Sequence, residues 1–528
     1  MKIFVVLMGF LLLHCSAFAS ENVNGVVNVT PKSFDPESWL STKEPYPYDN
    51  VPIREMVIPM SHDSGSFSIK SLEPVDKSAV TQNLNFVSQL NKGYRAFDFR
   101  LIYQNNEMKF THASIYGEPE NLGLKNIKNW LNRHPDQIIF IYVQQIKGGD
   151  KANLLGIQNI IDTLGKSEIF ERGFLQSNKD GSAFTLNDIK YFHQNTGGHE
   201  QVFLITTRGV ANTIPSLSHY LFIAGRSDDE NSDFYEYQPH DTDDNGILFQ
   251  TMQQKIHGTN GYHVPYQKDF GSYIRFENTP TVSDTAQIIS CPLCMAGTPS
   301  DMLHWGMETN KYLPSFLRRS LQAYLQGKVN INFISVDAAG TLYIADNNAT
   351  IDFSFLAYLM DIAKSKILLG QSSDSVMKSF LKDWPHTFLV VSKPESPIFK
   401  EGDVDRSGQV RFTVKANDGS VILQNRVSIN HAYAVSSALY FGKGYSISFQ
   451  GSAPDKSWED LRDKNGNISF TIDDLFNNNA VTTIHSHAWL HIFSHRWFAE
   501  STKNEPWVYS DSYAHHIPDD KQWLAGES

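Results

Sequence analysis

The sequence predicts an α/β protein: a distorted (β/α) TIM-type barrel followed by a C-terminal all-β module. Two observations indicate the barrel. From residue 51 onward, short apolar runs alternate with segments of helical periodicity, and no glycine-rich phosphate loop follows a strand. A third observation indicates the second module: after about residue 390 the chain changes to short alternating segments separated by turns such as Asp418-Gly419. A length of 528 residues also exceeds what one compact core usually holds.

Six apolar runs are predicted to be strands of the first domain. They are 56–60, 94–103, 108–113, 138–143, 202–206 and 329–336. The run 138–143 is continuously apolar, as expected of a strand buried on both faces, and 329–336 is expected to close the barrel. Residues 210–310 carry acidic stretches and many aromatic residues, and are expected to form long loops with one or two further strands.

Helices are predicted between these strands from apolar residues at helical spacing. The residues that set the spacing are Val80, Leu84, Val87 and Leu90, then Leu124, Ile127, Trp130 and Leu131, and later Phe316, Leu317, Leu321 and Leu325. Gly93 stands where the first helix should end, and Pro135 lies just beyond the second. The barrel domain is predicted to span residues 51–390.

The C-terminal module, 391–528, is predicted from segments of period two. The expected strands are 388–391, 410–414, 421–427, 445–449 and 468–472, which suit a sandwich, and the aromatic-rich segment 489–497 is expected to end the module as a helix. Six histidines lie in this part of the chain, at 485, 487, 491, 495, 515 and 516. Their spacing suits a zinc site, but ordinary surface or core histidines are the favoured interpretation.

The first residues have the pattern of a secretory signal peptide. Lys2 supplies a positive charge, an apolar core follows, and Ala17-Phe18-Ala19 is a cleavage site of the A-x-A kind. We therefore expect residues 1–19 to be removed after Ala19 and the protein to be secreted, either extracellular or periplasmic. Lipidation at Cys15 is the less favoured alternative, because His14 is a poor neighbour for it. Residues 20–50 are polar and are expected to form an extended lead-in.

The net charge argues against two classes of partner, and the cysteine content argues against a thioredoxin-like redox site. The net charge of −12 argues against nucleic acid and against a polybasic membrane anchor, so any lipid contact should come from aromatic and aliphatic side chains. Cys291 and Cys294 form a C-x-x-C pair without a thioredoxin-like surrounding. A short disulfide or two reduced cysteines is the favoured interpretation. The sequence does not give the oligomeric state.

Three strand ends carry residues suited to phosphodiester chemistry. His62 and Asp63 follow the first strand directly, and His112 ends the third strand. Asp98 and Arg100 share one face of the second strand, because side chains alternate along a strand. Two histidines can act as general base and general acid around a phosphodiester, and a guanidinium binds phosphate oxygens in a bidentate manner. A structural ion pair and incidental histidines remain the alternative.

These residues resemble the bacterial phosphatidylinositol-specific phospholipases C, the X-domain family. The matching stretches are Ser61-His62-Asp63-Ser64-Gly65, Thr81-Gln82, Gln89-Leu90, residues 93–100, Thr111-His112 and residues 135–139. Arg208 matches an arginine that contacts inositol hydroxyls, and Asp337 matches the carboxylate that orients the first histidine. The resemblance covers about residues 45–345 and is loose over 210–310. It implies a TIM-type barrel with this active site.

The resemblance also implies a role for each residue. His62, oriented by Asp337, would take the proton from the inositol 2-hydroxyl, and Arg100 would stabilise the phosphoryl oxygens. His112, with Asp63 beside it, would protonate the departing diacylglycerol oxygen. Asp98 would position Arg100 and the imidazoles. The products would be diacylglycerol and inositol 1,2-cyclic phosphate.

No cofactor or metal is expected, because calcium-dependent members of the family use carboxylates where this chain has Arg100. Two departures from the family pattern concern headgroup recognition. Gln144 stands where bacterial relatives carry a charged residue, and the tyrosine that stacks on the inositol ring has three candidates, at 262, 266 and 273.

Two alternatives stay open. One is the same chemistry on another phospholipid or a glycosylated lipid anchor. The other is an inactive barrel that binds lipid or glycan. In the favoured interpretation the partner is a phospholipid membrane surface that carries the substrate.

Overall fold

The computed structural model describes most of residues 27–225 and 332–383, and it describes the remaining regions mainly through their strands and α10. The described residues are 27–225 without 29, 31–32, 43–45, 71–78, 113–114 and 175–183; the strands 234–237 and 272–275; residues 303, 306, 310, 313–325, 332–344 and 349–383; residue 419; and the strands between 388 and 494. The predicted signal peptide, the Cys291/Cys294 pair, Tyr262 and Tyr266 lie outside these residues, and Tyr273 is described only by its backbone.

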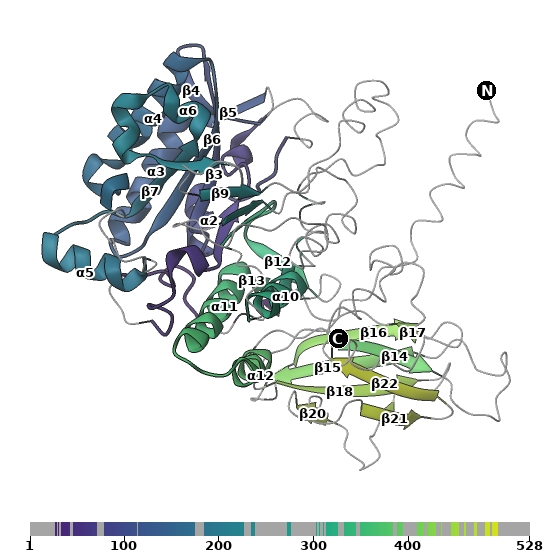
Figure 1. The fold of residues 1–528 in the computed structure, drawn as a ribbon. Coiled ribbons are helices and arrows are strands. Elements are labelled where there is room, and N and C mark those ends of the chain that lie inside the picture. The colour runs from purple at the N-terminus through teal and green to yellow at the C-terminus, as the bar shows by residue number, and fades with distance from the viewer. Residues whose placement is uncertain are drawn as a thin grey trace, which may run out of the picture.

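Eight parallel strands of the described chain close into a barrel (Figure 1). They are β2 (Ile58–Ser61), β3 (Ala96–Gln104), β6 (Ile139–Lys147), β7 (Val202–Thr207), β8 (Phe222–Gly225), β9 (Phe234–Tyr237), β10 (Ser272–Arg275) and β11 (Phe333–Val336). The sheet closes because β2 pairs with β11 on one side and with β3 on the other. The predicted TIM-type barrel is therefore confirmed, and the strand predicted to close it is β11.

The sequence of β6 explains how the barrel wall is packed. Phe140 faces the barrel interior, where its ring stacks on Phe203 and meets Phe333 edge-on, both at 4.9 Å between centroids. Ile139 and Ile141 point outward into the core that lies under the helices. Both faces of the strand are thus buried, which is why its sequence is a continuous apolar run.

Helices cover the outside of the wall in the left part of Figure 1. In chain order the helices are α2 (Phe86–Asn91), α3 (Glu120–Arg133), α4 (Asp150–Leu164), α5 (Leu186–Thr196), α6 (Arg208–Asn212), α10 (Leu313–Leu325), α11 (Phe353–Leu368) and α12 (Ser373–Asp383). The predicted first helix is shorter than expected. It starts at Phe86 because Asn85 caps it by accepting a hydrogen bond from the Ser88 N–H, so Val80 and Leu84 precede the helix.

The third predicted strand lies outside the barrel ring. It is β4 (Glu107–His112), which pairs antiparallel with β3 and then with β5 (Ile115–Pro119). Its Phe110 ring packs against Phe86 and against Gly65 of the loop after β2. A Cβ on Gly65 would lie 2.3 Å from the Phe110 ring, so only glycine allows this approach.

The lead-in was predicted to be extended, and its described residues instead pack against the barrel. Trp39 and Tyr48 are buried, and Trp39 Nε1 donates to the carbonyl of Gly93 at 2.8 Å. Arg95, which precedes β3, is fully buried and donates to the carbonyls of Pro36 and Glu37. The prediction was wrong because it rested on the polar composition of the segment and gave no weight to Trp39 and Tyr48. Burial of these two large side chains outweighs the conformational entropy lost when the segment is ordered.

The C-terminal strands pair antiparallel in two sheets. The strands are β14 (Phe388–Lys393), β15 (Gln409–Ala416), β16 (Val421–Ser428), β17 (Ala434–Val435), β18 (Tyr445–Ser452), β19 (Glu459–Asp460), β20 (Ser469–Thr471), β21 (Val481–His485) and β22 (Ala488–Ser494). The first sheet has the order β17-β14-β22-β21, and the second has β16-β15-β18-β19 with β20 beside β18. That these sheets form a separate module stays a prediction.

The helix predicted over 489–497 is wrong. Its residues 489–494 lie in β22, which pairs with β14 and with β21. Two flanking strands satisfy the backbone groups of β22, and its aromatic and β-branched residues fit a pleated surface, so tertiary pairing decided the conformation. Of the histidines in this region, His485 and His491 lie in β21 and β22, and their side chains are not described.

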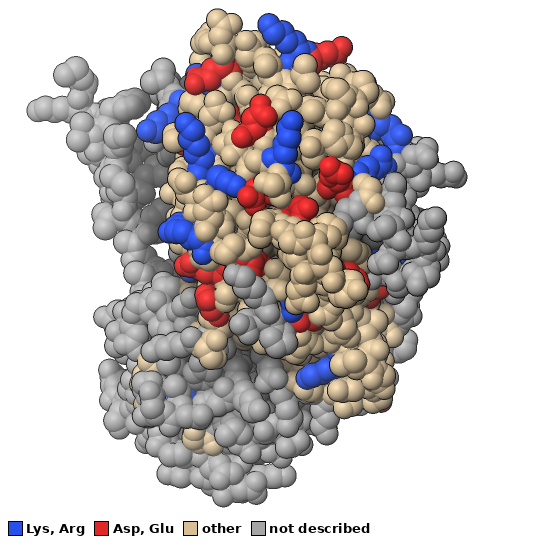
Figure 2. All heavy atoms as spheres, turned by 90° about the vertical axis from the view of Figure 1, so that its left-hand side faces the viewer, with Lys and Arg blue, Asp and Glu red and all other residues tan. Residues whose placement is uncertain are grey.

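Two surface properties concern membranes and charged partners. In the described part of the chain, no helix combines the length and the apolar character needed to cross a bilayer. On the face shown in Figure 2, lysine and arginine side chains alternate with aspartate and glutamate over the described residues. That face therefore carries no continuous field of one sign.

Glu120, the first residue of α3, gives a prediction for the pH dependence of stability. Its side chain is fully buried, and burial raises its pKa to about 8, although the Asn159 amide donates to it at 3.1 Å. Between pH 4.5 and 8 the folded chain therefore binds more protons at this position than the unfolded chain, so this group's contribution to stability falls as the pH rises.

Glu120→Gln should remove this decrease in stability with rising pH. The variant and the wild type should unfold at the same temperature near pH 4.5, and the variant should be the more stable by at least about 1.4 kcal/mol at pH 8, the equivalent of one pKa unit. Thermal unfolding followed by circular dichroism at several pH values measures this difference. A gap that stays constant with pH would contradict it.

Candidate active site

The loop after β2 places His62 and Asp63 at the carboxyl end of the barrel. The His62 N–H donates to the Val336 carbonyl at 3.0 Å, and the Ser64 N–H donates to the Asp98 carbonyl at 2.9 Å. Asp63 has a φ of 42°, the left-handed region that aspartate tolerates better than most residues. The backbone thus turns sharply between β11 and β3, and the turn stores strain at the site.

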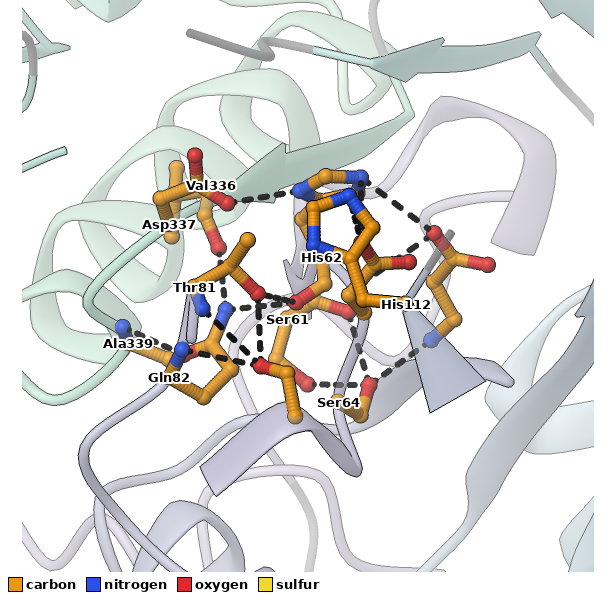
Figure 3. Close-up of polar contacts among 12 residues, drawn as sticks. Ser61, His62, Ser64, Thr81, Gln82, His112, Val336, Asp337 and Ala339 are labelled. Atoms are coloured by element: carbon orange, nitrogen blue, oxygen red, sulfur yellow. Dashed lines mark hydrogen bonds and ion pairs between the residues drawn. The ribbon is translucent and has the colours of Figure 1, made fainter. Parts of the chain in front are cut away.

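His62 is held in one tautomer by its two neighbours. Asp337, just after β11, places Oδ1 2.6 Å from Nδ1 of His62 (Figure 3). On the other side of the ring, Arg100 Nη2 lies 2.7 Å from Nε2. A guanidinium has only donors, so Nε2 must accept, and Nδ1 therefore carries the proton that it donates to Asp337. This neutral imidazole has its lone pair on Nε2, as a general base requires. The predicted contact between His62 and Asp337 is confirmed.

Arg100 lies between the two buried carboxylates of the site. Its Nε forms an ion pair with Asp63 Oδ1, and its Nη2 is 3.6 Å from Asp98 Oδ2. Asp63 and Asp98 are buried, whereas the Arg100 side chain keeps 15% of its exposure. The strand β3 therefore presents Asp98 and Arg100 on one face, as predicted, with the cation oriented and still accessible from outside.

His112 approaches Asp63 from the other side. Its Nε2 is 3.5 Å from Asp63 Oδ2, and the same oxygen is 3.6 Å from Nε2 of His62. Nδ1 of His112 is 2.9 Å from the Ala79 carbonyl, which can only accept, so Nδ1 is protonated. His112 is more exposed than His62. Both imidazoles thus face the carboxylate of Asp63. His62 is buried, and His112 is partly exposed.

The cluster could also offer ligands to a metal ion. Ligand atoms of His62, Asp63 and Asp98 lie within 4.8 Å of one another. The Arg100 guanidinium contacts all three of these groups, so a divalent cation there would meet a positive charge at close range. The residues present therefore fit a guanidinium better than a metal.

The two predicted substrate-binding residues lie at the same end of the barrel. Gln144 is the extra residue in the pairing of β3 with β6, where Phe99 is opposite Val143 and Arg100 is opposite Gln145. Such bulges redirect side chains next to active sites. Arg208 begins α6 directly after β7 and is half-buried. Their roles in binding stay predictions.

Sequence reasoning assigned no role to a layer of buried polar residues behind the loop of His62 and the loop of Asp337. Thr81 and Ser66 are both buried, their hydroxyls are 2.7 Å apart, and Thr81 Oγ1 donates to the His62 carbonyl at 3.1 Å. Gln82 and Gln89 are also fully buried. The available signal was the run Thr81-Gln82 of polar residues within a segment that otherwise has apolar periodicity.

Comparisons with known proteins cover part of the chain. No family model matches the sequence. A human protein named PI-PLC X domain-containing protein 2 is 31% identical over 128 residues, which cover 20% of this chain and 41% of that protein. The 1-phosphatidylinositol phosphodiesterase of Staphylococcus aureus is 32% identical over 147 residues, 27% of this chain and 39% of that one. The chain thus spans about two fifths of the length of these relatives.

Solved structures of similar fold include two bacterial enzymes. The phosphatidylinositol-specific phospholipase C of Listeria monocytogenes has a TM-score of 0.40 and 14% identity, covering 63% of this chain and 99% of that chain. The enzyme of the same name from S. aureus has a TM-score of 0.42 and 14% identity, covering 61% of this chain and 97% of that chain. In sequence, the chain is similar to PI-PLC X domain-containing proteins and bacterial 1-phosphatidylinositol phosphodiesterases, which confirms the resemblance predicted from its motifs.

Proposed function

We propose that the protein is a secreted phospholipase C-type phosphodiesterase that cleaves phosphatidylinositol to diacylglycerol and inositol 1,2-cyclic phosphate. The observation that carries the proposal is the position of His62, with Nδ1 on Asp337 and Nε2 facing Arg100. A second imidazole, His112, lies across Asp63. The names and activities of the relatives add support.

In the first half of the reaction, His62 Nε2 accepts the proton of the inositol 2-hydroxyl. The 2-oxygen then forms a bond to phosphorus, and Asp337 stabilises the imidazolium that results. Arg100 must turn from His62 toward the phosphoryl oxygens, which frees the Nε2 lone pair as it neutralises the developing charge. In this way, binding of the phosphate activates the base.

In the second half, the bond between phosphorus and the glycerol oxygen breaks. The leaving oxygen takes a proton from Nε2 of His112, which lies 3.5 Å from Asp63 Oδ2. Proton and electron pairs balance: one proton enters at His62 and one leaves at His112. Asp98 holds the guanidinium, and Gln144 and Arg208 are proposed to contact the headgroup.

The reaction is proposed to need no metal ion, because Arg100 already carries a positive charge in the site. The guanidinium of Arg100 supplies the positive charge that a divalent cation would bring to the phosphoryl group. The substrate is proposed to be taken from a phospholipid surface, and the chain is proposed to reach it as an exported protein after cleavage behind Ala19.

The test is an assay of the full chain with vesicles of phosphatidylinositol or phosphatidylcholine, with and without excess EDTA. We expect diacylglycerol and cyclic inositol phosphate from phosphatidylinositol, at a rate that EDTA does not change. Phosphorus NMR identifies the cyclic product. Release of choline phosphate alone would show that the proposed inositol headgroup is wrong. Inhibition by EDTA would contradict metal independence. Absence of product from both lipids would contradict the enzymatic function.

A further inference from the structure

We propose that Gln82 is a positioning residue that holds His62 and Asp337 at their catalytic distance. The two residues lie 275 positions apart, on loops that follow β2 and β11. Their side chains must meet within a hydrogen bond, so the two loops have to be fixed relative to each other. Gln82 belongs to neither loop, and its amide contacts both (Figure 3). The effect on kcat that this inference predicts rests on the proposed function, whereas the effect on the tautomer of His62 does not.

The Gln82 amide makes three hydrogen bonds, all to backbone groups of the two loops. Its Nε2 donates to the His62 carbonyl at 2.7 Å and to the Val336 carbonyl at 2.9 Å. Its Oε1 accepts from the Ala339 N–H at 2.7 Å. The Val336 carbonyl belongs to the peptide that enters Asp337. The side chain therefore fixes the backbone from which each catalytic side chain projects.

The neighbouring residue anchors the same two loops a second time. Thr81 accepts from the Ala338 N–H through its carbonyl at 2.7 Å and donates to the His62 carbonyl through its hydroxyl. Ser66 in turn accepts from the Gln82 N–H at 3.0 Å. The segment Thr81-Gln82 is thus a bridge between the loop of His62 and the loop of Asp337.

The bridge holds backbone that does not adopt its conformation freely. Asp63 has a φ of 42° and Ala338 a φ of 50°, so each loop has a left-handed residue directly beside its catalytic residue. Such residues persist only where the surroundings determine them, at a cost of about 1–3 kcal/mol each. Without the amide, both loops can relax, and the imidazole of His62 loses its fixed alignment with Asp337.

The chemistry of the three bonds explains why glutamine suits this position. Two carbonyls need donors and one N–H needs an acceptor, and a primary amide offers both on one planar group. Glutamate keeps the acceptor but has no donor when ionised, and methionine keeps the volume but has neither. These two substitutions therefore separate the hydrogen bonds from the packing.

Gln89 provides a matched control. It is also a fully buried glutamine, and its Nε2 also donates to two carbonyls, of Ser64 at 3.0 Å and of Leu84 at 2.7 Å. Its amide bonds do not include the peptides of His62 or Asp337. Gln89→Met should therefore match Gln82→Met in the loss of a buried amide, and differ in its effect on the His62–Asp337 pair.

The experiment compares the wild type, Gln82→Met, Gln82→Glu and Gln89→Met as full chains labelled with ¹⁵N-histidine. Imidazole ¹⁵N shifts report the tautomer of His62, whose signal is identified by its loss in His62→Ala. We expect a single Nδ1–H tautomer in the wild type and in Gln89→Met, and a mixture in both Gln82 variants. In the cleavage assay, Gln82→Met should lower kcat by about 10–100-fold and change KM by less than about threefold, because geometry for the chemical step is lost rather than binding.

The outcomes separate this inference from the proposed function. The positioning role would be wrong if Gln82→Met kept both the wild-type tautomer of His62 and the wild-type kcat. If Gln82→Met does not fold, the same result in Gln82→Glu would contradict the role. Equal changes in Gln89→Met would also overturn it, because they would indicate a general loss of stability. A wild type that cleaves no phosphatidylinositol would overturn the function alone, since the tautomer of His62 is measured without substrate.

Discussion

His62→Ala should lower the rate of phosphatidylinositol cleavage by about 10²–10⁴-fold, the usual contribution of a general base. The imidazole is fully buried and held at both nitrogens by Asp337 and Arg100, so alanine removes the oriented lone pair on Nε2 that is proposed to accept the 2-hydroxyl proton. The loss should appear in kcat, with KM little changed, because the base acts on the reacting atoms. Initial rates on phosphatidylinositol vesicles at saturating lipid measure it.

Two further variants make this result specific. His134→Ala removes another histidine, which contacts the Trp130 carbonyl and Glu37 before β6 begins, at the amino end of the barrel. It should keep the wild-type rate. Asp337→Asn should lower kcat nearly as much as His62→Ala, because the asparagine amide no longer requires the proton on Nδ1. A wild-type rate in His62→Ala would rule out His62 as the base.

The barrel could be predicted because its signals are local. Each face of β6 is buried, so the run of apolar residues is visible in the sequence without knowledge of its neighbours. The same holds for α3, whose apolar residues recur on one face. The pairing of His62 with Asp337 was implied by the family resemblance, and the structure explains it, because β2 and β11 are adjacent parallel strands of the closed barrel.

The parts that sequence reasoning missed depend on distant contacts. The lead-in packs because Arg95 and Gly93, more than fifty residues later, offer donors and carbonyls to it. β22 is a strand because β14 and β21 flank it. Local periodicity contains no information on either partner. The same is true of Gln82, whose three hydrogen bonds end on residues near both ends of the barrel sequence.

The motif Ser61–Gly65 therefore encodes more than a histidine on a loop. Gly65 is required by the Phe110 ring, and Ser64 places its hydroxyl 2.8 Å from the Asp98 N–H. Asp63 turns the backbone and joins the two imidazoles. Asp63, Ser64 and Gly65 thus each have a structural reason that a pattern match alone does not give, and their contacts connect the loop after β2 with β3 and β4.

Arg100→Lys should lower kcat by about 10²–10³-fold, the usual cost of losing a donor to a developing negative charge. Lysine keeps the positive charge between Asp63 and Asp98, so the fold should be retained. It lacks the planar fork with which the guanidinium contacts Asp63, Asp98 and His62 together. The single ammonium cannot leave His62 for the phosphoryl group and remain paired with both carboxylates.

Arg100→Ala should be as inactive as the lysine variant or more so, and also less stable. Asp63 and Asp98 are fully buried, so removal of their cation leaves two carboxylates close together without a counter-charge, at a cost of about 3–5 kcal/mol. Thermal unfolding separates the two effects: the lysine variant should unfold near the wild-type temperature and the alanine variant well below it. Arg133→Lys, at the end of α3, is the matched control and should change neither quantity. Full activity in Arg100→Lys would mean that a point charge suffices, and the proposed exchange of Arg100 between His62 and the phosphate would be wrong.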